Sequence, residues 1–167
     1  VIGHATAGNG IRISDTVIVT KLDSTNSVNQ LGGYVGFINH NGSFDTQRPV
    51  EIRNSKSVID ISVDGQNIGG FIGQYIDSAG VTPQGGHVIS NSIVQGSLAL
   101  KTPLDSSNIH RGGFIGNNNG GKVYLSLAHL SALSGNNTIG LGFGLSTGGK
   151  IEESDLKASS MFCDSNN

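Results

Sequence analysis

The sequence predicts an all-β fold, and more specifically a right-handed parallel β-helix (a β-solenoid) of about four to five coils with loop insertions. Three observations lead to this prediction. The residue types favour strands, a glycine-rich unit recurs along the chain, and a second motif ending in serine follows each copy of that unit.

The composition favours strands over helices. Val and Ile together number 29, against 19 for Leu and Ala, and β-branched residues prefer strands. The 26 glycines supply turn positions. Hydrophobic residues make up 35% and charged residues 13%, so the chain can build a core although its charge is about half of the usual globular share.

The net charge, the length of the apolar runs and the cysteine count exclude or disfavour several classes of protein. A net charge of −2 rules out a basic nucleic-acid surface and argues against binding to an anionic membrane. No apolar run is long enough for a transmembrane helix, so we expect no membrane insertion. Cys163 is the single cysteine, which excludes an intrachain disulfide and a thiolate metal site. The sequence shows neither an initiator Met nor a signal peptide, and we expect it to come from within a longer protein.

A five-residue glycine unit recurs through the sequence. Clear copies span 32–36, 69–73 and 112–116, a looser copy spans 140–144, and residues 1–3 match the end of the unit. The spacings between the closing glycines are 33, 37, 43 and 28 residues. We therefore predict one repeat array over residues 1–167, whose units close at Gly3, Gly36, Gly73, Gly116 and Gly144.

An aliphatic residue, two variable residues and a serine form the second motif. Its copies are Ile11…Ser14, Ile52…Ser55, Ile89…Ser92, Val123…Ser126 and Ile151…Ser154. Asn precedes two of these serines. We favour a structural interpretation, in which small polar side chains hydrogen-bond from coil to coil at a corner. The functional alternative is a polar ladder that is offered to a ligand.

Short strands and tight corners account for the rest of each unit. Ile59, Ile61 and Val63 alternate with Asp60, Ser62 and Asp64, which predicts a strand with one solvent-exposed face. The segments 65–67, 117–121 and 146–149 read as turns. The uneven spacing of the units predicts insertions at 37–47, 74–84 and 100–107.

Stacked coils would bury the apolar residues of the glycine units in a continuous axial core, with equivalent residues roughly 4.8 Å apart. The predicted repeat core consists of Tyr34, Val35, Phe71, Ile72, Phe114, Ile115 and Phe143. A sandwich of hairpins would also suit the turn spacing, but it gives no reason for the glycine unit to recur.

Motifs for catalysis and metal binding are weak. Gly144–Gly148 matches the nucleophile-elbow pattern around Ser146, yet it aligns with Gly116–Gly120, so Ser146 occupies a corner position where the previous copy has Asn118. The histidines lack zinc-site spacing and the carboxylates are scattered singly. We predict no catalytic, cofactor or metal site. Asn41 and Asn136 begin glycosylation sequons, which apply only to a secreted eukaryotic protein.

The Gly-Gly-Phe-Ile-Gly core, the Gly-Lys-Val/Ile step and the following Ser together resemble the GLUG-type glycine-rich repeats of large bacterial and protist surface proteins. The resemblance covers essentially the whole chain. Leu141 departs from the pattern, because it stands where the second glycine belongs. The first copy lacks its glycine pair.

The resemblance implies a β-helical, extracellular or cell-surface region without catalytic residues of its own. We expect a non-enzymatic structural or adhesive segment that acts as a stalk, spacer or filament unit. The alternative is a carbohydrate-binding or carbohydrate-cleaving β-helix. The expected partners are other segments of the same longer protein, identical subunits stacked end to end, and surface glycans.

Overall fold

The computed structural model describes residues 2–6, 11–40, 50–77, 88–99, 109–135 and 138–163 of the 167-residue chain. Every regular element in these residues is a β-strand, and they contain no helix. The described strand pairs are parallel. The predicted all-β class is confirmed.

The strands form three sheets, which we call A, B and C. Sheet A consists of β1 (Ile2–Thr6), β4 (Val35–His40), β7 (Ile72–Asp77), β11 (Ile115–Asn119) and β15 (Phe143–Thr147). Sheet B consists of β2 (Ile11–Ser14), β5 (Val50–Arg53), β8 (Ile89–Ser90), β12 (Lys122–Tyr124) and β16 (Lys150–Glu152). Sheet C consists of β3 (Val17–Gly32), β6 (Lys56–Gly69), β9 (Ile93–Ala99), β10 (His110–Gly112), β13 (Leu127–Gly135), β14 (Thr138–Gly140), β17 (Asp155–Ala158) and β18 (Met161–Cys163).

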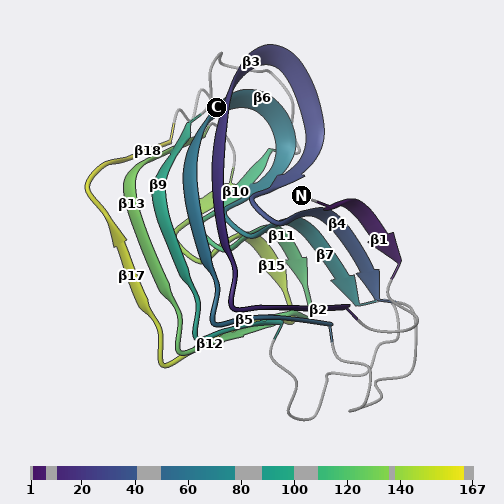
Figure 1. Ribbon diagram of the computed structural model, residues 1–167. Coiled ribbons are helices and arrows are strands. Elements are labelled where there is room, and N and C mark those ends of the chain that lie inside the picture. The colour runs from purple at the N-terminus through teal and green to yellow at the C-terminus, as the bar shows by residue number, and fades with distance from the viewer. Residues whose placement is uncertain are drawn as a thin grey trace.

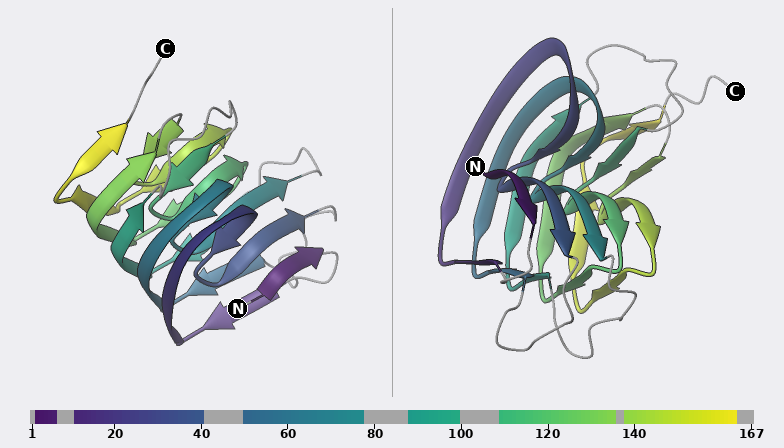
Figure 2. Two further views of the ribbon diagram at one scale, coloured as in Figure 1. Left: turned by 90° about the horizontal axis from the view of Figure 1, so that it is seen from above. Right: turned by 90° about the vertical axis from the view of Figure 1, so that its right-hand side faces the viewer.

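The chain visits the sheets in the order A, B, C and then returns to sheet A. Thus β4, β5 and β6 are followed by β7, β8 and β9, and each new strand lies beside its predecessor in the same sheet. Figures 1 and 2 show the resulting stack of parallel passes, with the long, curled β3 and β6 at one end. One pass therefore means one visit to sheets A, B and C.

The glycine units lie in register within sheet A. Val35 pairs with Ile2 and Ile72, and Ile115 pairs with Ile72 and Phe143, so the residues before the closing glycines are neighbours. A Cβ atom at Gly73 would lie 2.5 Å from the carbonyl oxygen of Gly36. The same atom at Gly116 would lie 2.6 Å from the carbonyl oxygen of Gly73. Glycine recurs because the backbone of the preceding pass occupies the space of a side chain.

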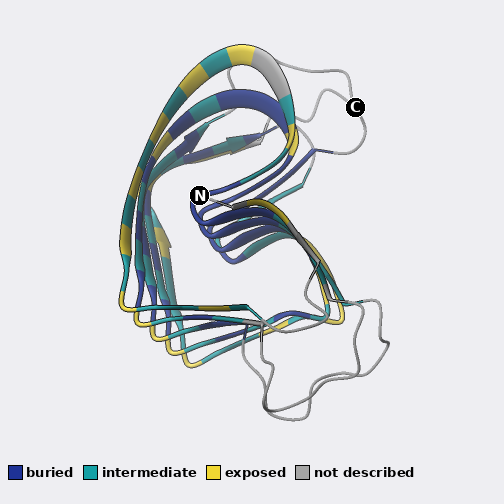
Figure 3. Ribbon diagram, turned by 45° about the vertical axis from the view of Figure 1, so that its right-hand side comes forward, coloured by how far each residue is buried: buried dark blue, intermediate teal, exposed yellow. Residues whose placement is uncertain are grey.

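The core lies between the sheets and continues from pass to pass (Figure 3). Of the predicted repeat core, Tyr34, Val35, Phe71, Ile72, Phe114 and Ile115 are buried, and Phe143 in the last pass is half-buried. The ring centroids of Tyr34 and Phe71 are 5.3 Å apart, and those of Phe71 and Phe114 are 6.3 Å apart. The aromatic residues of successive glycine units therefore stack on one another.

The predicted turn at residues 65–67 is wrong, because β6 continues to Gly69. Val28 of β3 pairs with Gly65, and Gln30 pairs with Asn67, after a shift of register between Ser24 and Val28. The long strands change direction by curling, and their ladder stays paired. The buried positions of Ile59, Ile61 and Val63 agree with the predicted alternation, but Asp64 is also buried at 4% exposure.

The other predicted turns and insertions are shorter than expected where the structure describes them. Residues 117–119 belong to β11 and residues 146–147 to β15, which leaves glycines with positive φ, Gly120 and Gly148, to make the corners. Residues 37–40 and 74–77 are likewise strand. The remainder of those two insertions, and all of 100–107, lie outside the described residues.

We predict that Phe71→Ala and Phe114→Ala each lower the free energy of unfolding by about 3 to 5 kcal/mol, because each leaves a cavity in a fully buried stack. Urea or thermal denaturation measures this change. The matched control is Leu145→Ala in β15, where the side chain is 37% exposed, and we expect a loss below about 1 kcal/mol. Equal effects at Phe71 and Leu145 would contradict the assigned core.

Candidate functional site

The corner between sheets B and C carries a polar arrangement that repeats in each described pass. One residue per pass adopts a left-handed backbone conformation there, with φ between 45° and 55°. The corner residues are Asp15, Asn54, Asn91, Leu125 and Glu153. Asn and Asp tolerate this conformation because their side chains bond locally, whereas Leu and Glu adopt it at an energetic cost.

A serine ladder runs beside these corner residues. The backbone amides of Ser55, Ser92 and Ser126 donate to the Oγ atoms of Ser92, Ser126 and Ser154 at 3.1–3.2 Å. Each hydroxyl in turn donates to the carbonyl oxygen two residues earlier at 2.7–2.8 Å. Ser55, Ser92 and Ser126 are buried, so the ladder satisfies polar groups that water does not reach.

The first member of the ladder is Thr16, and this corrects the predicted motif. Ile13 pairs with Ile52, and the Thr16 amide donates to the Ser55 Oγ atom at 3.4 Å. The first copy is therefore Ile13…Thr16 and not Ile11…Ser14. The predicted motif required a serine and therefore selected Ser14, two residues before Thr16. The hydroxyl group of Thr16 takes the place of the serine hydroxyl in this pass.

An amide ladder lies on the exposed side of the same corner. Asn91 Nδ2 donates to Asn54 Oδ1 at 2.8 Å, and Asn54 Nδ2 donates to Asp15 Oδ1 at 3.2 Å. The next corner residue, Leu125, is 47% exposed. In the last described pass, Glu153 Oε2 accepts a hydrogen bond from the Tyr124 hydroxyl at 3.2 Å, and the Glu153 carboxylate raises the Tyr124 pKa. The pass-to-pass bonds that the structural interpretation requires are present at this corner.

We predict that Ser92→Ala lowers the free energy of unfolding by about 1 to 3 kcal/mol, because the buried Ser55 amide loses its acceptor. Chemical denaturation measures the loss. Ser131→Ala is the control: its exposed hydroxyl donates to the Gly96 carbonyl, and its removal should cost no more than about 0.5 kcal/mol. If Ser92→Ala is as mild as the control, the ladder does not stabilise the stack.

Arg111 is a fully buried cation that the sequence reasoning missed. In the other passes of sheet C, the equivalent paired positions hold the aliphatic residues Leu31, Ile68 and Ile139. A charged residue at a position that is aliphatic in the other repeats was the sequence signal for this buried cation. Nη2 donates to the Val63 carbonyl at 2.8 Å and Nη1 to the Ala99 carbonyl at 3.3 Å. The β6–β9 ladder ends at the Ser62–Ala99 pair, so the guanidinium satisfies carbonyl groups where strand pairing stops.

Burial lowers the pKa of Arg111 to about 10, and the nearby Asp64 carboxylate opposes that shift. The side chain is therefore cationic at neutral pH. Among the described residues, Arg111 Nε and Asn67 Oδ1 are buried polar atoms without a hydrogen-bond partner. Burial also lowers the pKa of the adjacent His110, whose Nδ1 contacts the Thr138 hydroxyl. Arg111 holds together backbone groups of two passes.

We predict that Arg111→Leu lowers the free energy of unfolding by about 3 to 5 kcal/mol, although leucine suits the column. The loss arises because the Val63 and Ala99 carbonyls and the buried Asp64 carboxylate lose the cation. Arg12→Leu, at a guanidinium that is 53% exposed, is the control and should stay within about 0.5 kcal/mol. A neutral or stabilising effect of Arg111→Leu in denaturation would contradict this role.

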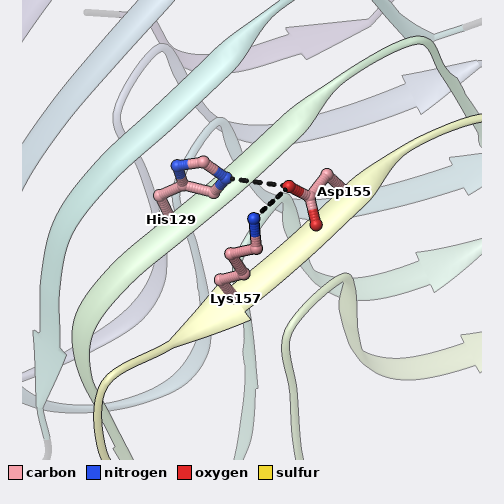
Figure 4. Close-up of polar contacts among 3 residues, drawn as sticks. All are labelled: His129, Asp155 and Lys157. Atoms are coloured by element: carbon pink, nitrogen blue, oxygen red, sulfur yellow. Dashed lines mark hydrogen bonds and ion pairs between the residues drawn. The ribbon is translucent and has the colours of Figure 1, made fainter.

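A second polar cluster lies on sheet C, where β13 meets β17 (Figure 4). Asp155 Oδ2 lies 2.8 Å from Lys157 Nζ and 3.3 Å from His129 Nε2. Lys157 and then His129 lower the pKa of Asp155. One carboxylate oxygen thus meets two donors, in an arrangement that ties neighbouring passes together. In the β13–β17 ladder His129 pairs with Lys157, while its ring contacts the Asp155 carboxylate, and the three side chains include no hydroxyl or thiol group.

Ser146 is exposed near the end of β15, two residues before the corner glycine Gly148, so the predicted corner position of Ser146 is wrong. Its Oγ accepts a hydrogen bond from Asn118 Nδ2 at 3.3 Å. Asn118 is buried, and its amide group also exchanges hydrogen bonds of 3.0 Å with the backbone of Gly121. The register pairs Asn118 with Ser146, as the sequence alignment of the two units predicts.

The remaining candidate residues do not form a reactive cluster in the described part of the chain. Within those residues, no group of three or more His, Cys, Asp or Glu side chains could hold a metal ion. The His4 ring lies 4.7 Å from the Phe37 ring. Asn41 and Asn136, the candidate glycosylation acceptors, lie outside the described residues.

A scan against models of protein families finds no match, and searches of curated proteins and of solved structures find no similar protein. Among the described residues, no helix has the length and apolar character needed to cross a membrane.

Proposed function

We propose that residues 1–167 form a right-handed parallel β-solenoid of about four to five coils and act as a non-enzymatic structural or adhesive segment of an extracellular protein. In this role the segment is a stalk, spacer or filament unit. The right-handed winding follows the general preference of connections between parallel strands in one sheet.

The observation that carries this proposal is the repeated A, B, C order of the strands, with the repeat units in register. Such a stack grows by adding equivalent passes, so its length can vary without a change of fold. A rod of variable length suits a part that spaces or displays other parts.

The use of the recurring polar groups also supports the proposal. The serine hydroxyls and the Asn54 and Asn91 amides bond to neighbouring passes, and so does the buried guanidinium of Arg111. These groups contribute to the strength of the stack. The resemblance to GLUG-type repeats of surface proteins is the support for a location outside the cell.

The experiment combines circular dichroism with a fluorophosphonate probe, which labels activated serines. We expect a strand-dominated spectrum and no labelling of either the chain or its Ser146→Ala variant, because the Ser146 hydroxyl is exposed on strand β15 and accepts a hydrogen bond from the Asn118 amide. Stoichiometric labelling that disappears in Ser146→Ala would overturn the non-enzymatic role. A helical content near about one third would overturn the solenoid.

A further inference from the structure

The corner residues of successive passes form one column, which contains two exposed asparagines, Asn54 and Asn91, each directly before a serine of the ladder. Asparagine is a thermolabile residue type. The backbone nitrogen of the next residue can bond to the asparagine Cγ atom, and the side-chain amide then leaves as ammonia with the proton of that nitrogen. Water opens the resulting succinimide ring and leaves an aspartate, or an isoaspartate whose main chain is longer by one carbon. Since both side chains are exposed, burial does not protect them from this conversion.

We propose that the serine ladder protects Asn54 and Asn91 from this conversion, and that removal of one serine hydroxyl opens only the asparagine one pass earlier to it. The two asparagines are thus latent modification sites, each controlled by a residue of a neighbouring pass. The inference goes beyond the proposed structural role and does not depend on the location or the partners of the protein.

The ladder holds the two backbone nitrogens that would attack. The Ser55 amide, which follows Asn54, donates to the Ser92 Oγ atom at 3.1 Å. The Ser92 amide, which follows Asn91, donates to the Ser126 Oγ atom at 3.2 Å. A bond from either nitrogen to a Cγ atom removes the hydrogen of that amide, so the ladder bond must break. Because Ser55 and Ser92 are 3% and 1% exposed, water does not replace the lost partner, and the broken bond adds to the barrier of the reaction.

The side-chain amides of the two asparagines are held by their neighbours in the corner column. Asn91 Nδ2 donates to Asn54 Oδ1 at 2.8 Å, and Asn54 Nδ2 donates to Asp15 Oδ1 at 3.2 Å. The corner residue after Asn91 is Leu125, whose side chain cannot form a hydrogen bond. Within the column Asn54 therefore has two side-chain bonds and Asn91 has one. Asn91 depends more strongly on the serine ladder for its protection.

Conversion would damage this corner in two ways. An aspartate formed at Asn54 would place its carboxylate beside that of Asp15, and like charges directly opposite one another on neighbouring passes are destabilising. An isoaspartate would lengthen the main chain between β5 and β6, although both strands pair in register with strands of the neighbouring passes. Protection of the asparagines therefore preserves the register of the stack over time.

The test is incubation of the whole chain at neutral pH, with peptide mass mapping of the conversion at each asparagine. In the folded wild-type chain we expect Asn54 and Asn91 to convert at least about 10-fold more slowly than in the chain unfolded in urea. Ser92→Ala should speed the conversion of Asn54 about 5- to 10-fold without speeding that of Asn91, because only the Ser55 amide loses its acceptor. Ser126→Ala should produce the opposite pattern, because it removes the acceptor of the Ser92 amide.

Asn119 in β11 is the matched control within the same chain. It is exposed and precedes Gly120, which has no side chain to hinder the attack, and the Gly120 amide donates to the Thr147 carbonyl at 2.9 Å. Neither alanine substitution removes that acceptor. A general loosening of the stack would speed the conversion of Asn119, whereas the loss of one ladder bond should leave Asn119 at its wild-type rate.

Ser92→Thr keeps a hydroxyl at the same position and should leave Asn54 at its wild-type rate. Equal acceleration at Asn54, Asn91 and Asn119 in both alanine variants would overturn the proposal. It is also overturned by a folded wild-type chain whose two corner asparagines convert as fast as those of the chain in urea. Circular dichroism of the same samples reports separately on the proposed fold, so a strand spectrum together with such fast conversion would reject the protection alone.

Discussion

Parallel backbone pairing between successive passes is the constraint on which the rest of the structure depends. Each strand bonds to a strand one pass away along the chain, so a side chain must suit the equivalent position in its neighbours. Glycine recurs at 36, 73 and 116 because the carbonyl oxygen of the preceding closing glycine fills the space where a Cβ atom would lie. The same constraint aligns Tyr34, Phe71 and Phe114 into an aromatic stack.

At the corners between sheets B and C the backbone bends tightly, and its buried amides still have hydrogen-bond partners. A residue with positive φ turns the chain from sheet B into sheet C in each described pass. The residue beside it is Thr16 in the first pass and a serine afterwards, and each serine hydroxyl accepts from the preceding pass and donates within its own. Buried backbone amides at a bend would otherwise lack partners, which is costly. The polar residues of the repeat are as much a part of the interior as the aliphatic ones.

Where a strand is interrupted, its last carbonyl groups need hydrogen-bond donors other than a neighbouring strand. β3 and β6 curl without a break, whereas the equivalent segment of the next pass is divided into β9 and β10. The Arg111 guanidinium bonds to carbonyl groups where the β6–β9 ladder stops. A buried cation is stabilising only with such partners, so Arg111 marks the place where the regular pattern ends.

The sequence by itself determined the all-β class, the in-register glycine units and the burial of Phe71 and Phe114, because these follow from residue types that recur at equivalent positions. It also predicted that Ser146 aligns with Asn118. Only the tertiary structure decided that Thr16 begins the serine ladder, that β6 passes through Gly65 without a turn, and that Asp64 and Arg111 are buried. These features depend on which groups of the neighbouring passes lack a hydrogen-bond partner, and that information lies in residues distant along the chain.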